Sequence, residues 1–425
     1  MKDHALRHIL HNEVHARPPE PVTGPMAISH LVQLYGNSSK QASRAHLQQL
    51  LSSHQLPMPD EDTNHMSVNI GLFRLRWELH TEFASWTFMR ACNEKMLEPN
   101  ARPHTAIEVV PQDWLDKLPG DSLSKIHLWL LPSKALAYDS LVEDLLHEDS
   151  LVASTLADGH GEVYTDFQIH SDGFSRMLLL AGSITARRQG RLVQQLLEIE
   201  TYRMAALLGL PAARSAGSVL IDAEKELAEL AHAIQTAAAQ DEASLLDRLT
   251  RLAGVVEGQY ASTHSRFSAS RAYFELVDRR ISDISESRIH GLQTIADFMD
   301  RRLSPARSTC EWASRRQTAL SERVSRMSNL LRTRVTFEQQ QNSQQFLSTM
   351  NKRQGLQLQL QATVEGLSVA AITYYIMGLI EHLTKAGEKL GWIKSPDIAA
   401  AASLPVVVLL VWWAIHRIHQ RVFKD

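Results

Sequence analysis

The sequence predicts an α+β protein with a mixed α/β domain, then long helices, then a two-helix transmembrane hairpin. Up to about Arg188, short alternating runs are punctuated by proline and glycine. From Gly190 onward, apolar residues recur every three or four positions, and two long uncharged runs stand near the C-terminus. We expect a cytoplasmic mixed α/β domain (1–188), long antiparallel helices (189–304), a stalk helix (305–363), a first transmembrane helix (364–383), an outer loop (384–397), a second transmembrane helix (398–415) and a basic cytoplasmic tail (416–425).

Composition restricts the class of protein. The chain has 425 residues, of which 44% are hydrophobic and 21% charged, so the apolar C-terminal region is a local exception in an otherwise soluble composition. A net charge of −3 argues against a nucleic-acid partner. The two cysteines, Cys92 and Cys310, are far apart, which excludes a disulfide framework and fits a reducing compartment. No apolar run follows Met1, so we expect no cleavable signal peptide.

Several elements of the N-terminal domain can be placed from local patterns. We expect a short helix over Ser43–Leu51 and a strand over Lys125–Leu131. A hairpin is expected where Glu162–Ile169 and Phe174–Leu180 flank the turn residues Ser171-Asp172-Gly173.

Apolar and charged residues alternate from Phe73 to Phe83, which predicts one half-buried strand with a charged face. Successive side chains of a strand point to opposite sides, so five polar residues share one side: Arg74, Arg76, Glu78, His80 and Glu82. Ion pairs across the exposed face of an antiparallel sheet explain this pattern. In the alternative interpretation, Glu78, His80 and Glu82 bind a regulatory divalent ion or contact a neighbouring subunit.

The middle of the chain carries apolar stripes at helical spacing. The stripes comprise Leu220, Leu227, Leu230 and Ile234, then Phe267, Phe274, Val277, Ile281 and Ile284, and then Leu292, Ile295 and Met299. They predict long antiparallel helices packed in a bundle or coiled coil. Glu200 and Arg203 are spaced to form a structural ion pair on one of these helices. Pro305 interrupts the pattern and should separate two helices.

A stalk helix is expected after Pro305. It begins with an apolar stripe at Leu320 and becomes polar over Glu338–Gln345, with no helix breaker before Val364. We therefore expect one helix from Leu320 to about Leu383, roughly 64 residues or about 96 Å long. This helix should also mediate self-association.

The transmembrane hairpin is predicted from two uncharged runs. Eighteen uncharged residues, Ile398 to Ile415, are long enough to cross a bilayer, whereas the run Gly366 to Ile380 has only fifteen. The shorter run continues a long helix in frame, and a real second span requires a first crossing. Basic residues flank the spans at Lys352, Arg353, Arg417, Arg421 and Lys424, against Lys385, Lys389 and Lys394 in the loop. With no export signal, we expect both termini in the cytoplasm.

Histidine is unusually frequent, with 20 residues. His4, His8, His11 and His15 follow a 4-3-4 spacing and would lie within about 60° of one another on a helix. Such a face can bind a divalent transition metal such as Zn²⁺ through imidazole nitrogens. It can also gain charge as the pH falls. The simpler alternative is a solvated polar face, since Pro18 ends the segment at once.

One face of the first span combines small, aromatic and acidic residues at helical spacing: Thr363, Gly366, Ala370, Tyr374, Met377 and Glu381. In a ring of subunits this face would line a pore, with a carboxylate ring from Glu381 at the outer mouth. The alternative is that the small residues only allow close helix packing and that Glu381 lies in water.

Four stretches resemble an uncharacterised family of bacterial membrane-anchored proteins, a domain family of unknown function. They are Asn12-Glu13-Val14-His15-Ala16-Arg17-Pro18, Trp77-Glu78-Leu79-His80-Thr81-Glu82-Phe83, Glu200-Thr201-Tyr202-Arg203-Met204 and Val364-Glu365-Gly366-Leu367-Ser368. The resemblance covers the whole chain and implies a multi-pass protein of the bacterial inner membrane. It supplies no activity to carry over.

The order of the segments is also similar to that of CorA-type magnesium channels, which place a cytoplasmic α/β domain and long helices before two spans. Their Gly-Met-Asn signature at the end of the first span is missing, and Tyr374-Tyr375-Ile376-Met377-Gly378 stands there instead.

Two functions follow as expectations. The first is a homo-oligomeric membrane protein of CorA-like architecture that conducts or senses a divalent cation, Mg²⁺ or Zn²⁺. The alternative is a membrane-tethered cytoplasmic scaffold that binds an unidentified protein partner and transports nothing. We do not expect an enzyme, since the chain has no glycine-rich phosphate loop, no G-x-S-x-G elbow and no H-E-x-x-H motif. No cofactor other than a divalent cation is expected, and the expected partners are the lipid bilayer and other copies of the chain.

Overall fold

The computed structural model describes residues 3–4, 6–8, 11, 19–36, 39–92, 103–132, 138–236, 241–392 and 394–422. The chain forms two compact units. Unit 1 consists of Met1–Gln235 and Asp247–Ser328, and unit 2 consists of Thr236–Leu246 and Asn329–Asp425.

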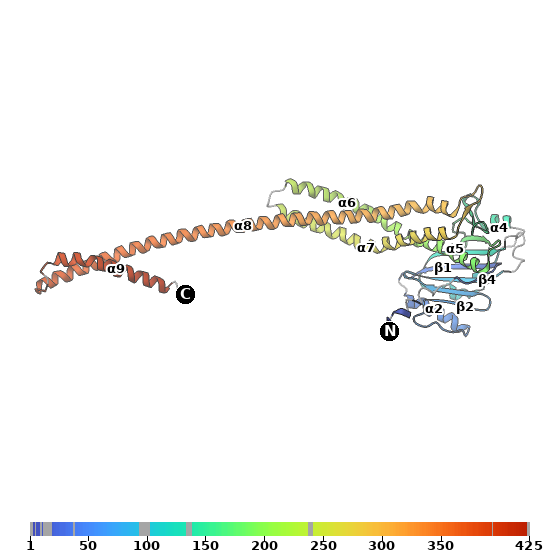
Figure 1. Ribbon diagram of the computed structural model, residues 1–425, viewed down its shortest axis with the longest axis horizontal. Coiled ribbons are helices and arrows are strands. Elements are labelled where there is room, and N and C mark those ends of the chain that lie inside the picture. Colours follow the sequence, from blue (N-terminus) through green and yellow to red (C-terminus); the bar gives the residue numbers. More distant parts are fainter. Residues whose placement is uncertain are drawn as a thin grey trace. The chain divides into compact units, whose positions relative to one another are not determined.

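Unit 1 is built on a nine-stranded sheet, in which the strand order is β2-β3-β4-β1-β5-β8-β7-β6-β9 among the described residues (Figure 1). The strands are β1 (Met26–Leu34), β2 (His65–Asn69), β3 (Arg74–Leu79), β4 (Phe83–Ala91), β5 (Asp121–Leu131), β6 (Val152–Leu156), β7 (Gly161–Thr165), β8 (Ser175–Leu180) and β9 (Ser287–Arg288). β5 and β8 are parallel, and the other neighbouring strands are antiparallel. This pattern confirms the α+β class.

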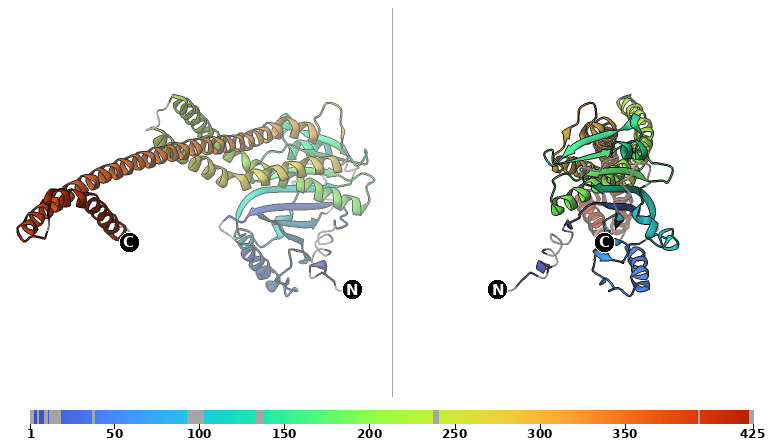
Figure 2. Two further views of the ribbon diagram at one scale, coloured as in Figure 1. Left: turned by 60° about the vertical axis from the view of Figure 1, so that its left-hand side comes forward. Right: turned by 90° about the vertical axis from the view of Figure 1, so that its right-hand side faces the viewer.

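Helix α5 (Ala186–Leu207) covers one face of the sheet, together with the C-terminal part of α7 (Glu242–Asp283) and the start of α8 (Ile295–Lys389). The core on this face joins Ile28 and Leu128 of the strands to Leu196, Val277 and Ile295 of the helices. α5 lies along the strands in Figure 2. Its apolar stripe is buried because the sheet offers a matching apolar face.

The opposite face of the sheet is covered by shorter elements. α2 (Lys40–Ser53), η2 (Ala106–Val109) and α3 (Gln112–Leu115) pack on β1 to β4, with four tryptophan and phenylalanine side chains, Trp77, Trp86, Phe88 and Trp114, in the core. α4 (Tyr138–Leu145), followed by η3 (Glu148–Ser150), packs nearer β5 to β8. The sheet is therefore buried on both faces, and polar side chains on it need partners from the covering helices.

Most of the expected elements of the N-terminal domain are confirmed. α2 contains the helix expected over Ser43–Leu51, β5 contains the expected strand, and β7 and β8 pair antiparallel around the expected hairpin. The single strand over Phe73–Phe83 is wrong. The chain bends after Leu79, His80 N–H donates to the Phe83 carbonyl at 2.9 Å, and β3 and β4 pair antiparallel. Arg76 and Glu78 of β3 lie under α5 rather than in solvent, whereas Arg74 at the start of the strand is exposed.

The long helices are confirmed by α6 (Gly209–Thr236), α7 and α8, and the stripe residues Leu220, Leu230, Phe274 and Val277 are buried. The expected break at Pro305 is wrong, because this residue lies inside α8. Proline removes one backbone hydrogen bond, and buried neighbours in the same helix, including Leu303 and Cys310, keep it packed through this point.

The N-terminus of α8 is fixed by a carboxylate from the preceding loop. Glu286 accepts the backbone N–H of Ile295 at 3.0 Å and of Ala296 at 2.7 Å, and the Ser154 hydroxyl donates to it at 2.6 Å. These are two of the N–H groups that a helix cannot satisfy internally, and the negative charge also complements the helix dipole.

In unit 2, α9 (Pro396–Val422) runs back along the C-terminal part of α8 (Figures 1 and 2). Val407 and Val411 of α9 and Thr373 of α8 are buried in this hairpin. The Ser403 hydroxyl lies 3.7 Å from Met377 Sδ across it. α8 contains the whole range expected for one stalk and span helix, and it has no break in the polar stretch that begins at Glu338.

Three helices among the described residues are long and apolar enough to cross a membrane: Ala186–Thr236, Ile295–Lys389 and Pro396–Ile418. The first belongs to unit 1, where 33% of its most apolar stretch is buried and α5 contributes to the core. For the other two, only 6% and 17% of that stretch is buried. Length and composition therefore agree with the expected two spans, and the exposed apolar side chains of those helices are not covered by other described residues.

Candidate functional site

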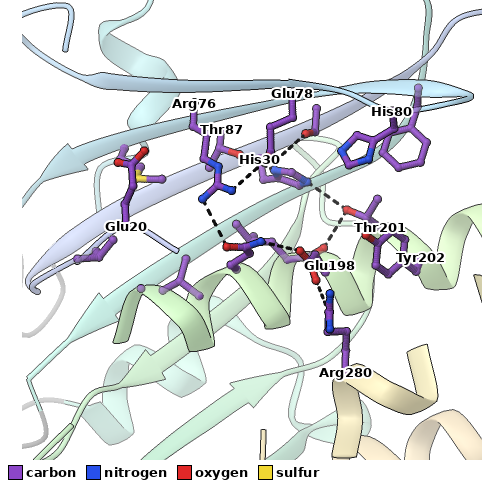
Figure 3. Close-up of a pocket in the computed structure, with 18 residues that line it drawn as sticks. Glu20, His30, Arg76, Glu78, His80, Thr87, Glu198, Thr201, Tyr202 and Arg280 are labelled. Atoms are coloured by element: carbon purple, nitrogen blue, oxygen red, sulfur yellow. Dashed lines mark hydrogen bonds and ion pairs between the residues drawn. The ribbon is translucent and has the colours of Figure 1, made fainter. Parts of the chain in front are cut away.

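A cavity of about 260 Å³ lies in unit 1 between α5 and the sheet (Figure 3). β1, β3, β4 and α5 form its walls, and Arg280 of α7 closes one side. The charged and polar lining residues are Glu20, His30, Arg76, Glu78, His80, Ser85, Thr87, Gln194, Glu198, Thr201, Tyr202 and Arg280. Because α5 presents polar groups to a polar patch of the sheet, the two surfaces leave space instead of a close apolar contact.

His30 lies at the base of the cavity, and both of its ring nitrogens are bonded. Nε2 is 3.1 Å from Thr201 Oγ1, and Nδ1 is 2.8 Å from Thr87 Oγ1. The Thr201 hydroxyl donates to the Leu197 carbonyl at 2.8 Å, so it accepts from an Nε2–H, and Nδ1 accepts from Thr87. Burial lowers the pKa of His30 to about 4, so its imidazole is neutral near pH 7.

Two ion pairs and one glutamine form a continuous polar chain across the cavity. Arg76 Nη2 donates to Glu78 Oε1 at 2.8 Å, and Arg76 Nη1 is 3.5 Å from Gln194 Oε1. Gln194 Nε2 then donates to Glu198 Oε1 at 2.8 Å, and Arg280 pairs with the other oxygen of Glu198. The Arg76 and Glu78 side chains are only 9% and 12% exposed. The sheet and α5 are thus joined by charged groups that have little contact with water.

One edge of the cavity is set by an extended segment that crosses α5. The Val22 N–H donates to the Ala186 carbonyl at 3.1 Å, and Arg74 pairs with Glu20 at 3.1 Å. Gly190 permits this approach, because a Cβ at this position would collide with the Glu20 carbonyl. Glycine is therefore required at position 190 because the backbone of Glu20 approaches so closely, and not because of its backbone angles.

The polar groups of this cavity are largely paired with one another. The Ser85 hydroxyl lies 3.4 Å from Glu78 Oε2, and His30 uses both nitrogens for threonine hydroxyls. Arg76 and Arg280 balance the carboxylates of Glu78 and Glu198. A cavity with one arginine–glutamate pair on the sheet and another on the helices suits a small molecule that itself carries a positive and a negative group.

The structure separates Glu78, His80 and Glu82, the three residues of the predicted charged strand that were expected to bind a cation. Glu78 and His80 line the cavity, and His80 stacks on Phe83 with ring centroids 4.4 Å apart. Glu82 instead accepts from Arg266 Nη2 at 2.9 Å and from the Tyr273 hydroxyl at 3.0 Å. The separation follows from the bend after β3, which the alternating pattern does not reveal.

The N-terminal histidines lie partly outside the described residues. His4, His8 and His11 are exposed, and His15 falls in the part that the structure does not describe. In the described part of the chain, the only three-residue group with ligand atoms close enough for a metal is His147, Asp166 and His170. Metal binding by the N-terminal set stays a prediction.

The six residues expected to line a pore all lie in α8 of unit 2. Thr363, Gly366, Ala370, Tyr374 and Glu381 are exposed within one chain, whereas Met377 is half-buried and contacts Ser403 of α9. Glu381 pairs with Lys385 at 2.6 Å. The pore-lining role stays a prediction, and Met377 belongs to the hairpin contact.

The ion pair expected from the sequence between Glu200 and Arg203 is present as two hydrogen bonds, of 3.0 and 2.6 Å. The sequence reasoning missed the polar residues of α5 that line the cavity, Gln194, Glu198 and Thr201. Their i, i+4, i+7 spacing on a helix that is otherwise apolar was the available signal.

A second buried histidine lies outside the cavity. His127 Nδ1 is 2.8 Å from Ser29 Oγ, and its ring stacks on Phe174 with centroids 3.9 Å apart. Burial lowers the pKa of His127 to about 4. Ser29 and His127 are 0% and 2% exposed, so this pair stabilises the sheet and does not face a substrate.

The chain belongs to the family described as a protein of unknown function, DUF3422, which matches residues 2–422. No curated protein and no solved structure matches the chain. The expected resemblance to an uncharacterised family is confirmed, and the similarity of layout to CorA channels stays an expectation.

Proposed function

We propose that this protein is a membrane-tethered binding protein: the α8–α9 hairpin anchors it in the bacterial inner membrane, and unit 1 binds a small zwitterionic molecule in the cytoplasm. The observation that carries the binding proposal is the partly buried chain of polar and charged groups around an open cavity, from Arg76 and Glu78 to Glu198 and Arg280.

The anchor is supported by the side chains that the hairpin leaves uncovered. Leu367, Leu379 and Leu383 of α8 are 73%, 65% and 70% exposed, and Leu409 of α9 is 65% exposed. Burying such side chains is favourable by about 25 cal/mol for each Å² removed from water. A bilayer removes them from water without any further protein contact, and the uncharged length of α9 fits a crossing.

Labelling of single introduced cysteines in intact cells tests the anchor. A membrane-impermeant thiol reagent should modify a cysteine at Ser395, in the loop between the two helices, before lysis. A cysteine at Ser53 in unit 1 should react only after lysis. The natural Cys92 and Cys310 are replaced by serine in both variants. Labelling at Ser395 only after lysis would contradict the proposed topology.

The binding proposal follows from the energetic cost of burying charge. A well-packed apolar replacement for a buried ion pair is often equally stable or more stable, so stability alone does not explain the nearly buried pair of Arg76 and Glu78 under α5. A cavity with a few converging polar groups is the usual form of a small-molecule site. Arg76 of β3 can bind a carboxylate through its guanidinium, and Glu198 of α5 can bind an ammonium group on the opposite side.

Thermal unfolding of the detergent-purified full chain tests this binding. Each of the twenty L-amino acids is the zwitterionic probe, and acetate and methylammonium carry one charge each. At least one amino acid should raise the unfolding midpoint, while the two single-charge ions should not. Arg76→Met and Glu198→Gln should remove the shift, and Arg251→Met, which removes an exposed arginine paired with Asp247 on α7, should retain it. A shift that persists in Arg76→Met, or no shift with any amino acid, would count against the proposal.

Cation conduction by a homo-oligomer is the second candidate. Its supporting observation is the exposed face of α8 from Thr363 to Tyr374, which the hairpin does not use. The ion pair between Glu381 and Lys385 weighs against it, because it neutralises the carboxylate that would attract cations at the mouth.

Vesicles containing the folded, oligomeric protein distinguish conduction from tethering. If the protein conducts cations, Mg²⁺, Zn²⁺ or Co²⁺ should flow down a gradient. This flux should be lower in Glu381→Lys and higher in Lys385→Gln. The tether expects no flux with any of these proteins. A scaffold that binds a protein partner should also give no flux. It differs from the proposed tether only because the amino-acid probes should not shift its unfolding midpoint.

A further inference from the structure

A second site lies in unit 1, beside η3 and the loop between β7 and β8. Two imidazoles and one carboxylate, from His147, Asp166 and His170, present ligand atoms that all lie within 4.8 Å of one another. None of these residues lines the cavity under α5. We propose that this group binds one divalent transition-metal ion, of the kind that accepts two imidazoles and a carboxylate, with Zn²⁺ as the reference case.

The carboxylate of Asp166 is the fixed part of the site. Its side chain is 0% exposed. Oδ1 accepts the backbone N–H of Gln168 at 3.0 Å, and Oδ2 accepts both the backbone N–H of His147 at 3.1 Å and Nε2 of His170 at 2.8 Å. The two backbone donors hold the carboxylate without neutralising it. A buried carboxylate needs an opposite charge, which a bound metal ion supplies.

The backbone around Asp166 is shaped to keep these groups together. Phe167, the next residue, has a φ of 52°, in the left-handed region that a phenylalanine rarely adopts. Its ring is held by Phe298, with centroids 4.7 Å apart. This turn brings His170 back over Asp166, four residues earlier. Such a strained backbone persists only where surrounding contacts over-determine it.

His147 distinguishes the group from an ordinary buried ion pair. Its ring is stacked on that of His170, with centroids 4.7 Å apart and planes 5° from parallel. No hydrogen bond from its ring nitrogens to a described residue accounts for this position. An exposed imidazole next to a buried carboxylate and a second imidazole offers a metal the third ligand of a site with three protein side chains.

The bound geometry requires one specific movement. The 2.8 Å contact between His170 Nε2 and Asp166 Oδ2 is a hydrogen bond, and a metal replaces its proton, which is released to solvent. Because a metal lies in the plane of each imidazole that binds it, the exposed His147 ring must rotate out of its stacked position. The fourth position is then open to water, as in sites where three side chains hold zinc.

Metal binding to the chelator-treated full chain in detergent tests the proposal. Zn²⁺ affinity is measured by competition with a chromophoric chelator, and Co²⁺ reports ligand number through its visible absorption. The wild type should bind one ion more tightly than any other. His147→Ala should weaken this binding at least about tenfold, and His170→Ala should abolish it. His104→Ala is the matched control, because it removes an exposed histidine paired with a carboxylate four residues away at 2.7 Å.

A double variant, His8→Ala with His11→Ala, separates this site from the N-terminal histidines. The tightest ion should remain in this variant, with the same Co²⁺ spectrum. Loss of the tightest ion there, together with its retention in His147→Ala, would overturn the proposal. Wild-type protein that binds no more Zn²⁺ than His147→Ala would do the same. His147 is exposed, so its variant is expected to fold even if replacement of the buried Asp166 prevents folding, and circular dichroism checks this.

Discussion

Acid should destabilise unit 1 through buried histidines, among them His30 and His127, and His127→Asn should remove part of this effect. His30 and His127 each have a pKa lowered by burial from 6.5 to about 4. Between these values the unfolded chain binds protons that the folded chain does not, so stability is complete above pH 6.5 and falls as the pH decreases toward 4. Each pKa unit corresponds to about 1.4 kcal/mol, so each histidine can remove about 3 kcal/mol in total and about 2 kcal/mol by pH 5.

Urea unfolding of the detergent-purified chain at pH 7.5 and pH 5, followed by tryptophan fluorescence, measures this effect. The loss of unfolding free energy between the two pH values should be about 2 kcal/mol smaller in His127→Asn than in the wild type. The variant also loses the stacking on Phe174 and is less stable at pH 7.5, but that loss is common to both pH values. His290→Asn, at an exposed position, should leave the difference unchanged. An identical pH dependence in the wild type and His127→Asn would refute burial as the cause.

Three further predictions concern local structure. Glu286→Ala should lower the unfolding free energy by about 2 kcal/mol, measured by urea unfolding, because the first N–H groups of α8 lose their acceptor. Glu286→Gln should lower the unfolding free energy by less, and an equal decrease in the two variants would argue against a role for charge. Gly190→Ala should release the segment at Glu20 from α5, detected as faster hydrogen exchange there, whereas Gly217→Ala, with open space around it, should not. Gln344→Pro should kink α8 and create a new site of limited proteolysis, since proline costs about 3 kcal/mol inside a helix; resistance equal to that of Gln344→Ala would contradict this.

The sequence was sufficient where periodicity and length decide the structure. The apolar stripe through Leu220 and Leu230 required a long helix with one buried face, and the uncharged run from Ile398 to Ile415 lies in one continuous apolar helix. The same reasoning failed at Pro305, because local propensity is weaker than packing along a helix of 95 residues. It also failed at the bend after Leu79, since alternation continues across a tight turn between two strands.

Only the tertiary structure determined the two candidate sites. Arg76 and Gln194 lie far apart in the sequence, and their proximity depends on α5 packing across β3. His147 reaches Asp166 and His170 through the path of the chain from η3 to the end of β7, and no spacing rule relates these positions. The sequence by itself determined which segments are helical, apolar or charged, because those properties depend on neighbouring residues. Which polar groups are buried together depends on contacts between distant segments, and these form only when the chain folds.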